Sequence, residues 1–362
     1  MHELVIVLSD LYVSQESPDR DLPPGVALPG LQRVIRFAAY SSIPRGWRAW
    51  LSRWLTGSDG DPPATTAAAG VAQSLHHADG TPPAARALAA PAPATALIAT
   101  PLNLVAGMTS IHLDRRSMLR LTPTDQAALA ADFQRVFHDS GFQLQPLDAG
   151  DFLMLAPSMS VGDTSEPARL MGASMADSRG AGAANQSLLR LGAEIEMWLH
   201  DHAVNDARRR RGEQPLTALW LWGAGPVPPA ANVGAPASNA GPPQSDIAFG
   251  RDSYVQGLWA TARSAKVLSL PQQLVDVFGY PHAQRAVLVI EIGSMLQSNP
   301  TWTFFDALEH IDRAFITPAI DGLNRARCER LVVLANDREW TLRARDRLKF
   351  WRRTPPGLSG LQ

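Results

Sequence analysis

The sequence predicts an α/β protein built on a doubly wound, mainly parallel sheet. Short, continuous apolar runs recur along the chain, and amphipathic helical patterns lie between several of them. Such runs are typical of strands buried on both faces of a parallel sheet, and their alternation with helices favours this fold class. The runs are Leu4–Leu8, Ala96–Ala99, Leu216–Leu221, Lys266–Leu270, Ala286–Ile292 and Arg330–Leu334, and a further strand is expected at Phe152–Ala156.

Four helices are expected between and after these strands. Thr124 is placed to cap the clearest one and Gly141 to end it, because hydroxyl side chains favour N-caps and glycine favours the residue after a helix. The apolar face of that helix repeats at helical spacing, at Leu129, Phe133, Val136 and Phe137. The others are expected at Ser187–His200, from Thr303 to a kink or end at Pro318, and at Trp340–Arg353.

The 362 residues correspond to about two domains at roughly 150 residues each. We expect a discontinuous α/β core formed by residues 1–101 and 185–362, with an inserted α+β subdomain at residues 102–157. Two segments rich in Ala, Pro and Gly, residues 59–96 and 226–243, are expected to be flexible.

Composition excludes several classes of protein. The 33 basic residues nearly balance the 34 acidic ones, which argues against a protein that binds nucleic acid through bulk charge. Cys328 is the only cysteine, so neither an intramolecular disulfide nor a thiolate zinc site can form. The first apolar run is short and lacks a basic leader, and no apolar stretch is long enough to span a membrane, so the expected compartment is the cytoplasm.

Ser9 and Asp10 are the first candidates for chemistry, because they follow the carboxyl end of a predicted parallel strand, where such sheets present ligands. A helix cap or a strand-end turn is an equally good interpretation of Asp10. His200 and His202 suggest a metal, but residues two apart on a helix face different directions, so capping and packing are favoured.

Two further features allow a structural and a functional interpretation. The run Arg208–Arg211 is either a solvated helix face, which is favoured, or an anion clamp. Trp220 and Trp222 are expected to pack in a core beside Gly223 and Gly225, whose lack of a side chain permits close approach or unusual dihedral angles. No P-loop, dinucleotide fingerprint, nucleophile elbow, zinc-protease motif or EF-hand loop occurs in the sequence.

A segment of 24 residues carries a family resemblance, through His202, Val204, Asn205, Gly212, Pro215, Gly223, Ala224 and Gly225 in that order. It resembles the cofactor-independent phosphoglycerate mutases of the archaeal type, which carry His-Pro-Val-Asn and end the segment in Arg-Gly-Ala-Gly. His112–Arg116 and Ala307–Asp312 resemble two further segments of that family. The likeness is greatest to a proteobacterial branch of phosphoglycerate mutase-like, RpfE-type regulatory proteins. It implies the fold of the alkaline phosphatase superfamily.

The resemblance also implies which residues would act. Active members hold two divalent metals through Asp and His and attack with Ser or Thr. In this chain Asp10, Asp337 and His202 are the weak candidates for metal ligands, and Ser9 or Thr109 for the nucleophile. Substrate binding would fall to Arg115, Arg116, Asn205, Arg208, Arg211, Trp222, Gly223 and Gly225.

Departures from the family pattern lead us to expect that the two-metal site is lost. Asp10 is followed by Leu11 instead of Gly, and no His follows Asp337. Trp222 replaces the family's Arg, which removes a phosphate contact, and the late Gly-His-x-Gly-Asp run is missing from Ser294–Thr303. Two metals need roughly five or six protein ligands, and the sequence does not supply them.

Three hypotheses follow. The first is a phosphoglycerate mutase-like protein without a metal cofactor that acts in ligand binding or regulation, with a small phosphorylated metabolite as the ligand. The second is an active mutase or phosphatase that uses Mn²⁺ or Zn²⁺. The third is an interaction protein whose basic, aromatic end, Arg343–Arg353, contacts an acidic protein partner or nucleic acid, although a helix packed on the sheet edge is favoured there. No membrane partner is expected.

Overall fold

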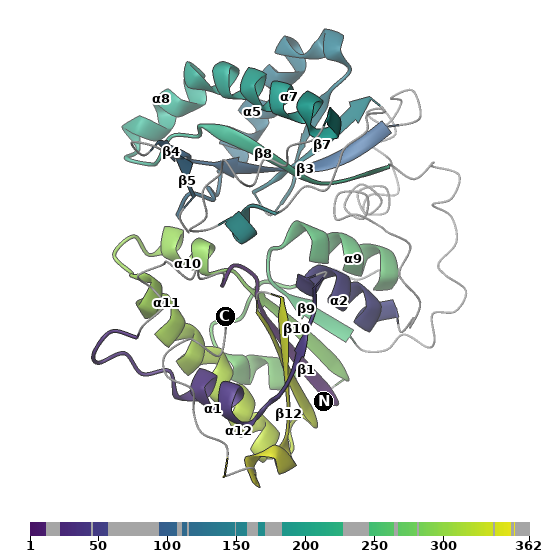
Figure 1. Ribbon diagram of the computed structural model, residues 1–362, viewed down its shortest axis with the longest axis vertical. Coiled ribbons are helices and arrows are strands. Elements are labelled where there is room, and N and C mark those ends of the chain that lie inside the picture. The colour runs from purple at the N-terminus through teal and green to yellow at the C-terminus, as the bar shows by residue number, and fades with distance from the viewer. Residues whose placement is uncertain are drawn as a thin grey trace. The chain divides into compact units, whose positions relative to one another are not determined.

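The computed structural model describes residues 1–11, 22–44, 46–56, 94–106, 111–113, 116–148, 150–157, 166–170, 183–226, 246–263, 267–280, 282–335, 337–348 and 351. The chain divides into two compact units (Figure 1). Unit 1 comprises Met1–Asp59, Asn239–Arg251 and Ala265–Gln362, and unit 2 comprises Gly60–Ser238 and Asp252–Ser264.

Unit 1 is built on a six-stranded sheet in the order β2-β12-β11-β1-β10-β9. Its strands are β1 (Glu3–Leu8), β2 (Ala39–Ser42), β9 (Asp246–Phe249), β10 (Arg285–Ile290), β11 (Arg330–Ala335) and β12 (Arg338–Arg343). The four strands from β11 to β9 are parallel, whereas β12 is antiparallel to both of its neighbours, β11 and β2. The central strand β1 is completely buried, as its unbroken apolar sequence predicts.

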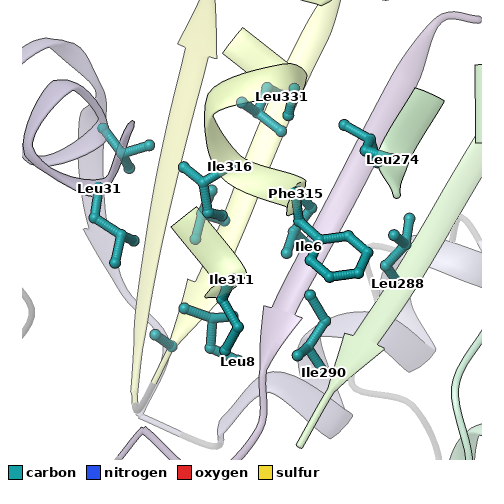
Figure 2. Close-up of a cluster of buried hydrophobic side chains, with 14 of the residues drawn as sticks. Ile6, Leu8, Leu31, Leu274, Leu288, Ile290, Ile311, Phe315, Ile316 and Leu331 are labelled. Atoms are coloured by element: carbon teal, nitrogen blue, oxygen red, sulfur yellow. The ribbon is translucent and has the colours of Figure 1, made fainter. Parts of the chain in front are cut away.

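One face of this sheet forms the main core of unit 1. Leu4, Ile6 and Leu8 of β1 point to this face, because alternate side chains of a strand share a face. The covering elements are α1 (Pro29–Phe37), η5 (Leu274–Gly279), α10 (Ile292–Ser298), α11 (Phe304–Ile311), the π-helical segment η6 (Asp312–Ile316) and α12 (Thr317–Asn324). Figure 1 shows α1, α11 and α12 on one side of the sheet, and Figure 2 shows side chains of β1, β10 and β11 meeting those of α1 and η6.

The opposite face of the sheet carries charges of alternating sign beneath α2 (Gly46–Thr56). The register aligns Asp246, Arg285, Glu3 and Arg330 on neighbouring strands, so each carboxylate has a guanidinium beside it. Trp54 of α2 covers this row: its indole N–H donates to Glu3 at 2.6 Å, and the Arg285 guanidinium lies 4.2 Å from its ring centroid. Opposite charges on adjacent strands stabilise this register.

Unit 2 contains a four-stranded antiparallel sheet in the order β6-β7-β3-β8. Its strands are β3 (Ala94–Leu102), β6 (Gln143–Pro146), β7 (Phe152–Pro157) and β8 (Ala218–Pro226), and the helices that contribute to its main core are α5 (Pro123–Val136), α7 (Ala183–His200) and α8 (Ala203–Arg210). Unit 2 also contains β4 (Val105–Ala106), β5 (Ile111–His112), η2 (His138–Ser140), η3 (Pro167–Leu170) and α9 (Ser253–Arg263). Phe133 of α5 stacks on Phe137 and meets Trp198 of α7 edge-on in this core.

The expected fold class is confirmed as mixed α/β with a parallel-rich sheet, but a second, antiparallel sheet is present. Strands β3 and β8, which the sequence assigned to the core, pair with each other, and β3 also pairs with β7. The unit boundaries therefore differ from the expected positions at residues 101 and 185. The two segments expected to be flexible lie largely outside the described residues.

Two predicted elements are wrong. The strand expected at Lys266–Leu270 is reduced, in its described part, to a single bridge between Leu268 and Phe249. The helix expected at Trp340–Arg353 is instead strand β12 followed by the short 3₁₀ segment η7 (Ala344–Leu348). Trp340 and Leu342 are both buried while Thr341 between them is less so, which is the period of two of a strand.

Two helix boundaries also differ from expectation. Thr122, not Thr124, caps α5, since the Thr122 side chain accepts the N–H of Asp125 at 3.1 Å. Pro318 does not end the third helix: it lies in the first turn of α12, and the backbone before it keeps helical dihedral angles at Ile316 and Thr317. The π-helical segment immediately before it joins α11 to α12.

A buried carboxylate fixes the start of α1 in unit 1. Asp312 is only 2% exposed, and its two oxygens accept the N–H groups of Gly30 at 3.0 Å and Leu31 at 2.6 Å. The hydroxyl of Thr317 also donates to Asp312, at 3.2 Å. Burial raises the pKa of this carboxyl, while these hydrogen bonds favour its charged form. The carboxylate thus satisfies helix N–H groups that have no partner within the helix.

We expect Asp312→Ala to lower the free energy of unfolding by about 2–4 kcal/mol, because two buried N–H groups would lose their acceptor. The matched control is Asp306→Ala, which removes an exposed capping box at the start of α11 and should cost less stability than Asp312→Ala. Urea denaturation of both variants measures the difference. Equal losses would show that burial adds nothing to the Asp312 cap.

Candidate functional site

Ser9 and Asp10 follow the carboxyl end of β1 in unit 1, as the sequence predicts. Asp10 is 3% exposed, and its two oxygens accept the N–H groups of Ile292 at 2.7 Å and Gly293 at 2.6 Å. Both N–H groups belong to the first turn of α10, which follows the neighbouring strand β10. The carboxylate therefore caps a helix, which is the structural alternative that the sequence left open.

The Ser9 side chain is bound to the same strand end. Its hydroxyl donates to the Ile290 carbonyl at 3.4 Å, and its backbone N–H donates to that carbonyl at 3.1 Å. Ser9 is only 6% exposed. A serine nucleophile needs a neighbouring base to take its proton, and a backbone carbonyl does not supply one.

Asp337 lies in the turn between β11 and β12, at the same edge of the sheet as Asp10, because β1 and β11 are parallel. Its backbone carbonyl accepts the N–H of Ile43 at 2.8 Å, which extends the pairing of β12 with β2. His202, the third candidate ligand, belongs to unit 2.

His202 caps helix α8. Its Nδ1 accepts the backbone N–H of Val204 at 3.1 Å, and its Nε2 lies 3.5 Å from Asp132 of α5. The imidazole packs edge-on against Trp198, whose indole N–H donates to Asp132 at 2.9 Å. Burial lowers the pKa of His202, which Asp132 only partly offsets, so the neutral ring that can accept the Val204 N–H is favoured.

Asn205 connects the end of α7 to the chain that leads into β8. Its side-chain NH₂ donates to the carbonyls of Leu199 and Leu216, each at 2.8 Å, and its oxygen accepts the Leu216 N–H at 2.7 Å. The side chain is 3% exposed, and these bonds occupy both hydrogens and the oxygen. Asn205 therefore acts as an internal clamp.

Arg208 and Arg211 meet two carboxylates. The buried Arg208 guanidinium lies 3.1 Å from Glu213 and 3.7 Å from Asp125, and its Nε donates to the Gln214 carbonyl at 2.8 Å. Arg211 donates to Asp125 at 2.6 Å and to both oxygens of Glu213. Burial lowers the pKa of Arg208, while the hydrogen bond from Arg211 lowers the pKa of Glu213 and raises that of Arg211. The anion clamp, which was the less favoured interpretation of this run, is thus already neutralised by side chains of this chain.

Trp222, Gly223 and Gly225 shape strand β8. The Trp222 indole N–H donates to the Thr100 hydroxyl at 2.9 Å, and its ring packs in the small core on one face of the sheet. The pairing of β3 with β8 shifts between Ala96 and Ile98, beside a Gly223 whose φ of 66° favours glycine. This bulge explains the need for glycine at 223 and confirms the expected unusual dihedral there.

Two of the candidate site residues, Arg115 and Thr109, lie outside the described residues. Arg116 is half-buried in unit 2, beside Ser117, whose carbonyl accepts the Asn103 N–H at 2.7 Å.

Cys328 is buried in unit 1, and burial raises the pKa of its thiol to about 11, so it carries no thiolate near neutral pH.

Within the described ranges, no group of three or more His, Cys, Asp and Glu side chains could hold a metal ion. Both oxygens of Asp10, the ligand that the resemblance favours, already accept N–H bonds.

Among the described helices, none has the length and apolar character required to cross a bilayer.

Sequence reasoning missed the acidic partners of these site residues. Asp125 and Asp132 lie on α5, and Glu213 follows α8, yet none of the three belongs to a recognisable motif. The acidic Glu213 beside the arginine run was the one available signal. Contacts between Asp125 and Arg211 span 86 positions, which no local pattern reveals.

No family model matches the chain, and no curated protein matches it either. Two of the solved structures that resemble it, both at low identity, are the following. One is the cofactor-independent phosphoglycerate mutase from Thermoplasma acidophilum, 15% identical, with a TM-score of 0.39, covering 94% of this chain and 89% of the other. The second is a protein from Pyrococcus horikoshii, 14% identical, with a TM-score of 0.44, covering 94% of this chain and 87% of the other. At this level of similarity the likeness carries no conclusion about activity.

His202→Ala should remove the cap of α8 and lower the free energy of unfolding by about 1 kcal/mol above pH 7. The pKa of His202 is lower in the folded chain than its usual value of about 6.5, so the unfolded state takes up the proton first. The stabilisation is therefore complete above about pH 6.5 and is lost as the pH falls through the folded-state pKa. Urea denaturation across pH 5 to 8 measures this.

The matched control is His200→Ala, because His200 has an 84% exposed side chain only two residues away. This variant should match the wild type at every pH. If the gap between wild type and His202→Ala stayed constant down to pH 5, the capping role of the neutral imidazole would be refuted.

Arg208→Ala should lower the free energy of unfolding by about 3–5 kcal/mol, because it leaves a carboxylate cluster without its buried partner. Arg209→Ala, one residue along, removes an exposed pair with Asp206 and should cost less than about 0.5 kcal/mol. Denaturation of both variants provides the comparison. An unchanged stability for Arg208→Ala, with loss of inorganic phosphate binding, would instead support an anion clamp.

Proposed function

We propose that this protein is a phosphoglycerate mutase-like protein that has lost the two-metal site and acts in ligand binding or regulation. The observation that carries the proposal is the position of Asp10, whose two oxygens both accept backbone N–H groups of α10. An Asp ligand of a catalytic metal needs an oxygen directed at the ion, and both oxygens here are directed at a helix.

The segment His202–Gly225 supports the same proposal. It carries the resemblance to the mutase family, yet its polar side chains stabilise the fold: His202 caps a helix, Asn205 joins two segments, and Arg208 neutralises carboxylates. In these roles the three side chains support the fold and do not take part in mutase chemistry. The departures at Leu11 and Trp222, where the family has Gly and Arg, point in the same direction.

The ligand that the resemblance favours is a small phosphorylated metabolite. Among the guanidinium groups that the resemblance places near a phosphate, we propose those of Arg115 and Arg116. A planar guanidinium recognises phosphate through paired hydrogen bonds. Arg116→Ala is therefore the variant that should weaken such binding.

The alternative is an active mutase or phosphatase that uses Mn²⁺ or Zn²⁺. It is favoured by one observation: Ser9, Asp10 and Asp337 all lie at the carboxyl edge of the parallel strands, where α/β enzymes bind their ligands. For that function the Asp10 carboxylate would have to leave the N-terminus of α10 and turn towards an ion.

Titration of the purified full chain with Mn²⁺ and Zn²⁺ by calorimetry separates the two functions. We expect no stoichiometric binding of either metal and no mutase turnover of 3-phosphoglycerate, with or without added metal. We expect Asp10→Ala to lower the free energy of unfolding by about 2–4 kcal/mol, because two buried donors lose their acceptor.

Asp10→Asn keeps one acceptor oxygen and should lose less stability, and Asp337→Asn at the same sheet edge serves as the control. Tight binding of two metal ions with turnover that Asp10→Asn abolishes would establish the enzyme and refute the proposal.

A further inference from the structure

Strand β2 (Ala39–Ser42) is an exposed edge of the sheet in unit 1. It is the outermost strand in the sheet order, and within the described part of the chain it pairs with β12 alone. All four of its residues are exposed. Edge strands that keep unpaired N–H and C=O groups are templates for another strand, which most proteins block or use.

The register shows which backbone groups face outward. Ile43 donates its N–H to the Asp337 carbonyl at 2.8 Å, so these two residues form a hydrogen-bonded pair. Hydrogen-bonded and non-hydrogen-bonded pairs alternate along an antiparallel ladder. The N–H and C=O groups of Tyr40 and Ser42 therefore point away from β12, towards any strand that adds to the edge.

An aromatic surface adjoins this edge. Tyr40 is 56% exposed, and its ring lies tilted against Trp340 of β12, with centroids 6.2 Å apart. The Arg338 guanidinium lies 5.5 Å from the Tyr40 ring centroid. An exposed tyrosine whose ring is held in place by a neighbouring tryptophan offers contact area to a side chain of an added strand. Little side-chain entropy is lost when that contact forms.

Positive charge lies at both ends of the strand. Arg36 is in the last turn of α1, just before β2, and Arg338 stands opposite Ser42. Glu339 is directed to the other face of the sheet, where it accepts from Trp50 and Ser41 and pairs with Arg330. Asp337, beyond Ser42, is the acidic residue that follows β11 at this end. Arg343 at the end of β12 is exposed and adds to the positive side.

We propose that the β2 edge binds an extended, acidic segment of a partner protein by strand addition. The outward groups of Tyr40 and Ser42 pair with the backbone of the partner, and Arg36 and Arg338 attract its carboxylates. A second copy of this chain is the less suitable occupant, because antiparallel pairing of two β2 strands sets Arg36 of one copy near Arg338 of the other. The inference does not depend on the proposed function.

The test uses a short fluorescein-labelled peptide of alternating valine and glutamate, added to the full chain and followed by fluorescence anisotropy. The control peptide replaces glutamate by lysine. We expect the acidic peptide to bind, and the basic peptide to bind at least about tenfold more weakly. We also expect binding to weaken as salt increases, because the contacts are exposed charges. Arg338→Glu should weaken binding of the acidic peptide.

Two further measurements address the backbone contacts. Tyr40→Pro removes an outward N–H, which an edge strand tolerates, and should abolish binding, whereas Tyr40→Thr keeps that N–H and should retain part of it. An acidic peptide methylated on alternate backbone nitrogens should also fail to bind, and this result does not depend on how any variant folds.

Three results would overturn the proposal. Equal binding of the acidic and basic peptides would remove the role of charge. No binding of the acidic peptide at millimolar concentration would mean that the arginines only protect the edge from aggregation. Self-association in sedimentation experiments that Tyr40→Pro abolishes would identify a second copy of the chain as the occupant.

Discussion

The hydrogen bonds from Ile292 and Gly293 to the Asp10 carboxylate are the constraint on which the arrangement of unit 1 depends. Parallel strands β1 and β10 end at the same edge, and the chain turns there into α10 in a region closed to water. Buried N–H groups without an acceptor are costly. The aspartate after β1 supplies the acceptor for the N–H groups of the helix that follows β10. Asp312 meets the same need for α1.

This use of carboxylates bears on the proposed function. The N–H groups at the start of α10 compete with any metal ion for the oxygens of Asp10, because each oxygen already accepts one N–H. In unit 2 the same competition is seen with the opposite charge, because Arg208 and Arg211 neutralise Asp125 and Glu213 and so have less capacity for a phosphate. Side chains that serve chemistry in one protein can in this way become structural supports in another with a related pattern.

Local patterns predicted elements where packing follows from sequence period alone. The apolar run of β1 and the helix α5 appear in the structure near their expected positions, because each buries apolar side chains, although Val136, expected on the buried face of α5, is 47% exposed. The prediction failed at Trp340–Arg353, where a basic, aromatic composition suggested a helix but burial alternates with a period of two. It also failed at Lys266–Leu270, where an apolar stretch of strand length makes only one bridge in its described part.

The mixed α/β class, the position of Ser9 and Asp10 after a buried strand, and the glycine that strand β8 needs at 223 all follow from local sequence patterns. The roles of the polar residues do not, because they depend on contacts between distant segments. Asp10 meets α10 across 282 positions of sequence, and Arg211 meets Asp125 across 86. Hydrogen bonds and ion pairs act over a few ångströms in space, so the partner that sets each side chain's role is fixed only when distant segments pack together.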